Sequence, residues 1–429
     1  MNLPVLGDAD AGELRDLGGK AAPLNRLRRA GFPVPAGFVV PVQVFARHAR
    51  ASGARTAGSI EEARERLLAH GADEELRTAV AAALDALPGG PDTPVAVRSS
   101  ATVEDAPGTA AAGVHDSFLG SRGPSAVTEA VLRCWASWWS PRDLRPSSGA
   151  GPDEADGMAV LVQVLVDAEA AGVLFTGERR VLEAVHGLGE SLVGGAVAPD
   201  SWELEGTGIR DHRPGSRELR SVRRGDRAIR EPLPAALRRR PPLSEDRVLE
   251  IDELGRWIAE QLGGPVDLEW AVDRAGVHVL QARPITAALP APSAEEAPVD
   301  GGSAVATGTV LRGVGASGGT ATGPVRVLRS VAELSRVRPG DVLLARGTDP
   351  AWTPLFPLIA AVVTETGGML SHAAIVAWEV GIPAVLAVPE AMERLEVGAE
   401  VRVDGERGTV AVIEPRSPAR GPGRAPGDG

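Results

Sequence analysis

A stretch without hydrophobic periodicity divides this 429-residue chain and limits how it can fold. Residues 287–301, with the sequence AALPAPSAEEAPVDG, are rich in alanine, proline and acidic residues, which is typical of an exposed linker. The C-terminal residues 415–429 have a composition that favours a disordered tail. We therefore predict one domain over residues 1–286 and a smaller one over residues 302–414, with no internal repeat.

The overall charge and the lack of long apolar runs exclude several classes of partner. A net charge of −12 and a pI of about 5.2 argue against a nucleic-acid-binding protein with a dominant basic face. No run of 18 apolar residues is present, and the N-terminus lacks the features of a signal peptide. The single cysteine, Cys134, cannot form an internal disulfide. We expect a soluble, cytoplasmic protein that binds neither nucleic acid nor membranes.

The basic residues are almost all of one kind. The chain has 44 arginines and a single lysine, Lys20, and it has no tyrosine and only two asparagines. Lysine, tyrosine and asparagine have AT-rich codons, so this bias indicates a GC-rich genome. An arginine in place of a lysine is therefore uninformative at most positions, whereas the retained Lys20 is a residue of interest.

Hydrophobic patterns in the larger block predict a mixed α/β domain. Residues 59–87 carry a helical pattern that ends at Pro88-Gly89-Gly90. Residues 210–240 contain a dense set of arginines, which we interpret as a solvated hairpin and helix face; an anion site is the alternative. Strand-like runs cover residues 95–97, which lead into a polar run at 98–100, and residues 158–162, 172–175 and 277–280.

The smaller block alternates short strands with turns around one helix, which predicts a small β-rich α/β domain. The helix is expected over residues 371–380, and Gly381 followed by Pro383 ends it. The strands are expected at residues 323–327, 341–344, 361–363, 383–386 and 401–403.

The start of this helix is a favourable place for phosphoryl chemistry. The Gly367-Gly368 turn lets backbone amides approach a ligand, and Ser371 is expected to cap the helix, so that His372 lies on its first turn. A helix N-terminus favours anions and disfavours a charged imidazole, because of its unpaired N–H groups and its dipole. The sequence therefore predicts a neutral, nucleophilic His372 that carries a phosphoryl group. A histidine near the helix cap with no chemistry is the alternative.

The residues around His372 resemble a known family. Residues 364–377, TETGGMLSHAAIVA, and 381–385, GIPAV, are similar to the swivelling phosphohistidine domain of phosphoenolpyruvate-utilising enzymes. That group includes phosphoenolpyruvate synthase, pyruvate phosphate dikinase and rifampicin phosphotransferase. The resemblance implies a small swivelling β/β/α domain with His372 as its catalytic residue. It extends to residues 315–319, 348–354 and 403–405.

The larger block resembles the ATP-grasp-like nucleotide-binding domain of the same enzymes. With both blocks together, the resemblance covers roughly residues 5–414. It implies an α/β chain in which an ATP-grasp-like nucleotide-binding domain precedes the swivelling β/β/α phosphohistidine domain. The matching motifs lie at residues 18–21, 31–38, 97–105, 187–190, 199–200, 267–271 and 281–286.

The matching residues imply a site for ATP and Mg²⁺. Lys20 is a compact cation suited to a polyphosphate, and Arg98 offers a planar fork for bidentate phosphate contact. Glu269 and Gln281 place oxygen ligands on adjacent strands, which suits Mg²⁺. A surface lysine and a pairing of Glu269 with an arginine are the alternatives. The remaining site residues are Gly113 and Ser117 at lid positions, Gln163 on the adenine side, and Arg283, which shares a strand face with Gln281 and neutralises charge on the transferred group.

Three features depart from the family pattern. Trp378 stands where the family has arginine, which removes a cation expected near the phosphohistidine. Residues 110–114, AAAGV, replace a Ser-Phe-Ala-Gly-Gln run, which weakens the contacts of the lid. We expect no domain for binding the phosphoryl acceptor within this sequence, because only the predicted linker lies between the two blocks and only the predicted tail follows them.

The resemblance implies an ATP-dependent phosphotransferase of the dikinase type. His372 takes the β-phosphoryl group of ATP, with AMP and phosphate as eventual products. The acceptor is a small molecule, held by a separate acceptor-domain subunit or at the interface of the two domains. One alternative is a rifampicin-phosphotransferase-like or biosynthetic kinase that acts directly on a small molecule. Another is a non-catalytic protein or a carrier in a phosphorelay.

Overall fold

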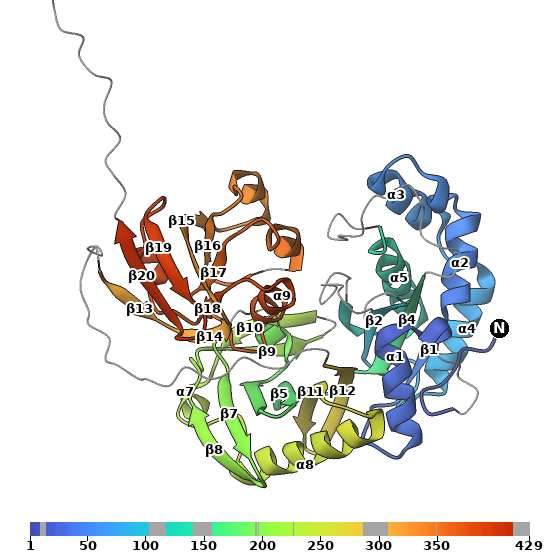
Figure 1. Cartoon of the computed structure of the whole chain (residues 1–429). Helices are drawn as coiled ribbons and strands as arrows, with labels where there is room; N and C mark the ends of the chain where they lie inside the picture. Colours follow the sequence, from blue (N-terminus) through green and yellow to red (C-terminus); the bar gives the residue numbers. More distant parts are fainter. Residues whose placement is uncertain are drawn as a thin grey trace, which may run out of the picture. The chain divides into compact units, whose positions relative to one another are not determined.

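The computed structural model describes residues 1–8, 14–102, 117–139, 157–193, 195, 197–225, 227–285, 308–348 and 350–414. The chain forms two compact units (Figure 1). The predicted linker and tail lie outside the described residues, so the predicted domain boundaries stay predictions. The first unit comprises Met1–Leu289, Asp349–Pro354 and Leu370–His372, and the second comprises Pro290–Thr348, Leu355–Met369 and Ala373–Gly429.

A four-stranded antiparallel sheet forms one part of the first unit, in the order β1 (Gly37–Val40), β4 (Met158–Val164), β2 (Val95–Ala101) and β3 (Ser117–Ser121). Successive side chains of a strand point to opposite faces, and here each face belongs to a different core. Leu161 packs in one apolar cluster, whereas its neighbour Val162 packs in the other, with Trp135. The helices and turn of this part are α2 (Val42–Ala51), η1 (Ala54–Thr56), α3 (Ile60–His70), α4 (Glu74–Asp85) and α5 (Gly123–Ala136).

A six-stranded antiparallel sheet forms the other part of the first unit, in the order β12-β11-β5-β6-β7-β8. The long helix α8 (Glu245–Leu262) packs against β5 and β11 through one apolar face. Ser244 caps its start and Gly263, at φ 87°, ends it. The strands are β5 (Ala170–Thr176), β6 (Arg180–His186), β7 (Asp200–Glu205), β8 (Gly208–Arg213), β11 (Val266–Asp273) and β12 (Gly276–Pro284).

The arginine-rich segment forms the expected hairpin. Strands β9 (Leu219–Arg224) and β10 (Arg227–Pro232) pair antiparallel, and the short helix α7 (Ala235–Arg238) follows them in the chain. Another short helix, α6 (Glu190–Val193), lies between β6 and β7. Arg220 and Arg224 donate hydrogen bonds to Glu231 at 2.6 and 2.9 Å. Much of the local positive charge is therefore paired within the hairpin.

An eight-stranded mixed sheet organises the smaller block, in the order β13-β20-β19-β15-β16-β17-β18-β14. Strands β15 to β18 run parallel, and the expected helix lies between β17 and β18 in the chain as α9 (His372–Val380). The five expected strands are all present. The elements are β13 (Val310–Arg312), β14 (Val314–Ser317), β15 (Thr320–Leu328), η2 (Val331–Arg336), β16 (Val342–Ala345), η3 (Pro350–Leu355), β17 (Ala361–Thr364), β18 (Ala384–Leu386), α10 (Ala391–Arg394), β19 (Glu400–Asp404) and β20 (Thr409–Glu414).

Two predictions of secondary structure need correction. The single helix expected over residues 59–87 is two helices, α3 and α4, because Gly71 adopts φ 71° and Asp73 caps a new helix by accepting a hydrogen bond from Leu76 N at 2.7 Å. The strand expected at residues 95–97 continues through the polar run to Ala101. It does so because β4 pairs with it along its full length.

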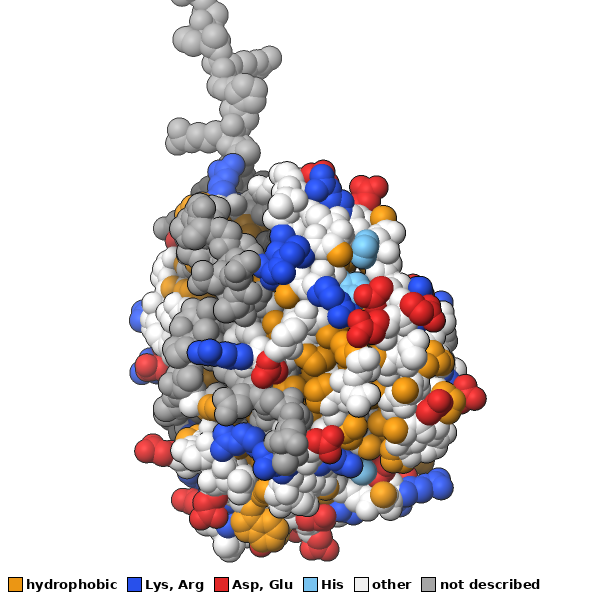
Figure 2. Space-filling view, turned by 90° about the vertical axis from the view of Figure 1, so that its right-hand side faces the viewer, with side chains coloured by type: hydrophobic (Ala, Val, Ile, Leu, Met, Phe, Trp, Pro, Cys, Tyr) orange, Lys and Arg blue, Asp and Glu red, His pale blue; other side chains and the backbone are white. Residues whose placement is uncertain are grey.

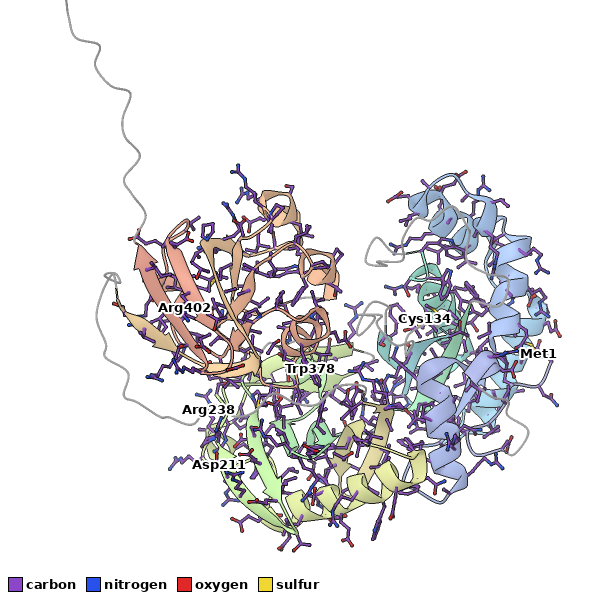
Figure 3. The ribbon with its side chains drawn as sticks, in the orientation of Figure 1. Met1, Cys134, Asp211, Arg238, Trp378 and Arg402 are labelled. Atoms are coloured by element: carbon purple, nitrogen blue, oxygen red, sulfur yellow. The ribbon has the colours of Figure 1, made fainter. Side chains whose placement is uncertain are left out.

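Figure 2 shows one face of the molecule, on which acidic and basic side chains are interspersed. Cys134 is buried on α5 in the first unit, and Trp378 lies on α9 (Figure 3). Within the described ranges, no helix combines the length and the apolar character that crossing a membrane requires.

Candidate functional site

A break in the first helix lets it lie directly against strand β2. Helix α1 (Leu14–Arg29) has non-helical geometry at Gly18, where φ is 73° and a Cβ atom would come within 1.9 Å of the carbonyl oxygen of Ser100. The Ser100 hydroxyl donates to Leu17 O at 2.7 Å and accepts from the backbone N–H groups of Lys20 and Ala21, both at 3.1 Å. Ser100 therefore caps the second part of α1 from a distant strand, and only glycine fits at position 18.

The same contact positions the lone lysine beside the arginine-serine strand. The Lys20 ammonium donates a hydrogen bond to Ser99 O at 3.0 Å, and Lys20 is partly exposed. Residue 99 is the neighbour of Arg98 on β2, so two of the predicted phosphate-binding cations belong to one local structure. Because Lys20 is partly exposed, the phosphate-binding role and the alternative of a surface lysine both stay predictions.

Arg98 connects the two sheets of the first unit. Its Nη1 donates to Leu280 O at 2.8 Å, and its Nη2 donates to Glu269 Oε2 at 2.8 Å and to Gln281 Oε1 at 2.9 Å. The Arg98 side chain is 14% exposed and that of Glu269 is 25% exposed. The structure therefore brings one predicted phosphate-binding residue and both predicted metal ligands together, and Glu269 pairs with an arginine that is itself a predicted site residue.

The donor set of these two strands fits Mg²⁺. Glu269 and Gln281 are direct cross-strand partners on β11 and β12, which brings their Cβ atoms to about 5 Å in such a pair. A carboxylate and an amide oxygen are the kind of ligand that Mg²⁺ prefers. Arg283 lies opposite Asp267 two residues along, so it shares the face of Gln281 as predicted, and its Nε donates to Asp267 Oδ2 at 2.6 Å.

A cavity of about 400 Å³ adjoins this cluster. Four predicted site residues line it, namely Arg98, Ser117, Gln163 and Glu269, whereas Lys20 does not. Ser117 lies opposite Arg98 in the pairing of β3 with β2, and Gln163 is buried and donates to Pro35 O at 3.3 Å. The predicted lid residue Gly113 lies outside the described residues. Much of the remaining wall is apolar, with Leu119, Val164, Leu165, Val166, Ala171, Val173 and Leu188.

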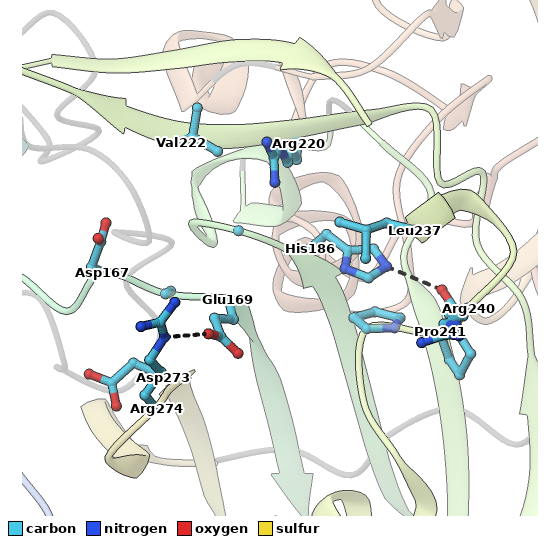
Figure 4. A pocket seen from close by; sticks show the side chains of 13 residues that line it. Asp167, Glu169, His186, Arg220, Val222, Leu237, Arg240, Pro241, Asp273 and Arg274 are labelled. Carbon is cyan, nitrogen blue, oxygen red and sulfur yellow. Dashed lines mark hydrogen bonds and ion pairs between the residues drawn. The ribbon is translucent and has the colours of Figure 1, made fainter. Parts of the chain in front are cut away.

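A larger cavity of about 730 Å³ in the first unit contains none of the predicted site residues (Figure 4). His186 lies in its wall with Nε2 at 3.2 Å from Arg240 O, and burial lowers the pKa of this imidazole. Arg274 and Glu169 form an exposed ion pair at 3.6 Å. Charges of both signs thus line this cavity, and they define no single ligand chemistry.

His372 begins helix α9, as the sequence predicts, but the helix cap expected from Ser371 is not formed. Oγ of Ser371 makes no hydrogen bond among the described residues, so the prediction that this hydroxyl caps the helix is wrong. Instead, Oγ1 of Thr353 lies 3.0 Å from Nε2 of His372. A hydroxyl can donate or accept, so this contact orients the imidazole ring in either tautomer. Sequence reasoning missed Thr353, although the residues 348–354 that contain it carry part of the resemblance.

Two domain families match the sequence of this chain. The pyruvate phosphate dikinase AMP/ATP-binding domain matches residues 14–300, and the mobile domain of PEP-utilising enzymes matches residues 337–408. The chain belongs to the PEP-utilising enzyme family. The predicted fold class, an α/β nucleotide-binding domain followed by a mobile domain, is confirmed at this level.

Several curated relatives carry the name phosphoenolpyruvate synthase. The chain is 36% identical to a probable phosphoenolpyruvate synthase of Methanothermobacter thermautotrophicus, over 92% of this chain and 62% of that protein. It is 35% identical to a probable one of Archaeoglobus fulgidus, over 95% and 58% of the two chains, and 37% identical to that of Aeropyrum pernix, over 92% and 56%. The chain therefore spans about six-tenths of the length of these relatives.

Lys20→Arg is expected to weaken the binding of ATP about tenfold or more, the value of one hydrogen bond to a charged group, while the melting temperature stays near that of the wild type. A guanidinium is longer and planar, so it does not keep the position that the contact with Ser99 O gives the ammonium next to Arg98, where a phosphate chain that extends beyond the cavity would meet it. Calorimetric titration with ATP and thermal unfolding measure the two effects. Unchanged affinity would mean that the chain retains this lysine by chance.

Proposed function

We propose that this chain binds ATP in the 400 Å³ cavity and transfers a phosphoryl group through His372 to a small-molecule acceptor. The observation that carries the proposal is that Arg98 and Glu269 line that cavity and that Arg98 also bonds Gln281 beside it, in a chain of this family. The reaction is of the dikinase type: His372 takes the β-phosphoryl group and water takes the γ-phosphoryl group, so that ATP yields AMP and phosphate. We propose that this phosphoryl transfer takes place in the cytoplasm.

The residues of the first unit have separate roles in this proposal. The apolar part of the cavity takes the adenine near Gln163, and the end with Arg98 and Ser117 takes the phosphates. Glu269 and Gln281 would hold Mg²⁺, which would neutralise phosphate charge when bound. Arg98 donates to an oxygen of each of these two residues, so it would release them when the metal binds and would then contact the phosphates. Lys20 and Arg283 add further positive charge at this edge of the sheet.

The residues around His372 support its role as the phosphoryl carrier. His372 begins α9 shortly after the Gly367-Gly368 turn, in which Gly367 adopts φ 110°. The N-terminus of a helix favours an anionic phosphoryl group through its N–H groups and its dipole. Thr353 holds the imidazole ring in one orientation, so less conformational entropy is lost when the ring attacks the phosphoryl group. We propose that the phosphohistidine domain moves on the linker to deliver the group.

Incubation with ATP radiolabelled at its β-phosphate tests the function. Label is expected on the protein in the presence of Mg²⁺, together with release of inorganic phosphate, whereas ATP labelled at the γ-phosphate leaves the protein unlabelled. Absence of label under all conditions would contradict the proposed transfer. AMP release with candidate acceptors, with and without a partner subunit, then distinguishes a separate acceptor subunit from a directly bound small molecule.

Thr353→Val is expected to slow the labelling of His372 about tenfold, because the isosteric valine removes the hydroxyl that orients the imidazole. Thr353→Ser keeps the hydroxyl and should restore most of the rate. A single-turnover labelling experiment measures both. If valine and serine variants lost the same fraction of the rate, the residue would act by packing and not through its hydroxyl.

A further inference from the structure

Arg230 lies on β10 of the arginine-rich hairpin, and its side chain lines the 400 Å³ cavity. The sequence alone favoured a solvated surface for this segment, with an anion site as the alternative. In the structure, Arg230 lines the same cavity as four residues of the predicted nucleotide site, namely Arg98, Ser117, Gln163 and Glu269. Strand β10 also packs beside β3, the strand that begins at Ser117.

Backbone contacts fix the position of Arg230 relative to the cavity. Arg230 pairs directly with Ser221 of β9, and Ser221 O accepts a hydrogen bond from Leu188 N at 2.8 Å. The backbone of Gly187 lies close to Ser221: its φ is 80°, and a Cβ atom at this position would come within 2.2 Å of Ser221 O. Leu188 itself lines the cavity, so the hairpin is attached to the cavity wall and not free beside it.

The charges of the hairpin distinguish Arg230 from its neighbours. Arg220 and Arg224 both pair with Glu231, which lies on the opposite face of the hairpin from Arg230, since successive side chains alternate. Arg98, the other cation of the cavity wall, pairs with Glu269. Within the described part of the chain, Arg230 has no ion pair. Its guanidinium is exposed at the cavity and available to an anionic ligand.

We infer that Arg230 is a further nucleotide-binding residue, which contacts a phosphate group of the bound nucleotide. The inference rests on the proposed ATP site. A guanidinium presents parallel N–H donors that match phosphate oxygens. The negative charge of the phosphates would also balance the charge of Arg230, for which the protein supplies no ion-pair partner among the described residues. The hairpin thereby contributes to binding through one side chain, whereas its remaining arginines serve the fold.

Arg230→Ala and Arg227→Ala are a matched pair for testing this inference. Arg227 is an exposed arginine of the same strand, but it lies on the other face and lines neither cavity. Calorimetric titrations of the full chain with ATP, ADP and adenosine give the affinities. Arg230→Ala is expected to weaken ATP and ADP about tenfold and adenosine less than twofold, and the ATP loss should shrink at high salt. Arg227→Ala should bind all three like the wild type.

The outcomes separate this inference from the proposed function. Wild-type affinity of Arg230→Ala for ATP overturns the inference and leaves the ATP site intact. An equal loss for adenosine and ATP also overturns it, because the residue would then act on the base, the sugar or the fold. If the wild-type chain binds no ATP at all, the proposed function falls and the inference with it.

Discussion

His372→Ala is expected to reduce the labelling of the protein from ATP by at least about 1,000-fold, because the imidazole is the proposed nucleophile. Alanine is a good helix former, so α9 should still form. The variant loses the contact with Thr353, worth about 1 kcal/mol, which a folded domain tolerates. Labelling by ATP with a radioactive β-phosphate, followed by gel analysis, measures the loss.

Two controls make the result on His372 specific. The affinity for ATP should remain within about twofold of the wild type, because His372 does not line the 400 Å³ cavity and the loss concerns transfer and not binding. His70→Ala, at the exposed end of α3, should be labelled like the wild type. Persistent label in His372→Ala would assign the phosphoryl group to another residue.

Arg98→Met is expected to weaken ATP binding about 100-fold, because it removes the fixed guanidinium at the phosphate end of the cavity. It should also cost about 1–3 kcal/mol of stability, since the Glu269 carboxylate then loses its partner in a partly buried place. Urea unfolding and calorimetric titration measure the two effects. Arg77→Met, at an exposed ion pair on α4, is the control and should change neither.

A double variant tests whether the unpaired Glu269 carboxylate causes the loss of stability. In Arg98→Met/Glu269→Gln that carboxylate is gone, so part of the lost stability should return, while ATP binding stays weak because a proposed metal ligand is removed together with the arginine. Recovery of ATP binding together with stability would mean that Arg98 acts on the nucleotide only by holding the two sheets together. That result would remove Arg98 from the binding site.

Much of the fold follows from patterns that are local in the sequence. The strands expected in both blocks, the hairpin of the arginine-rich segment and the helix at His372 are all present. The helix expected over residues 59–87 was wrong in one respect, because a left-handed Gly71 and a capping Asp73 interrupt a periodicity that continues past them. The cap expected from Ser371 was also wrong, because the type of a residue does not specify which way its hydroxyl turns.

The sequence by itself determined the residue types of the site and their place on strands and helices. Motif and chemistry single out Lys20, Arg98, Glu269, Gln281 and His372, because each side chain suits phosphate, metal or phosphoryl chemistry in any fold that exposes it. The amino-acid composition also identifies Lys20, the single lysine, as a residue of interest. These inferences need only the identity of a residue and its near neighbours.

The tertiary structure alone decided which of these side chains meet. Arg98 reaches Glu269 across 171 residues of chain, and the Ser100 hydroxyl caps a helix 79 residues away. Thr353 and Arg230 gain their roles only from partners that no local pattern reveals, an imidazole in one case and a cavity wall in the other. Contacts between distant segments depend on sheet pairing and on packing over the whole unit, and a local stretch of sequence does not contain that information.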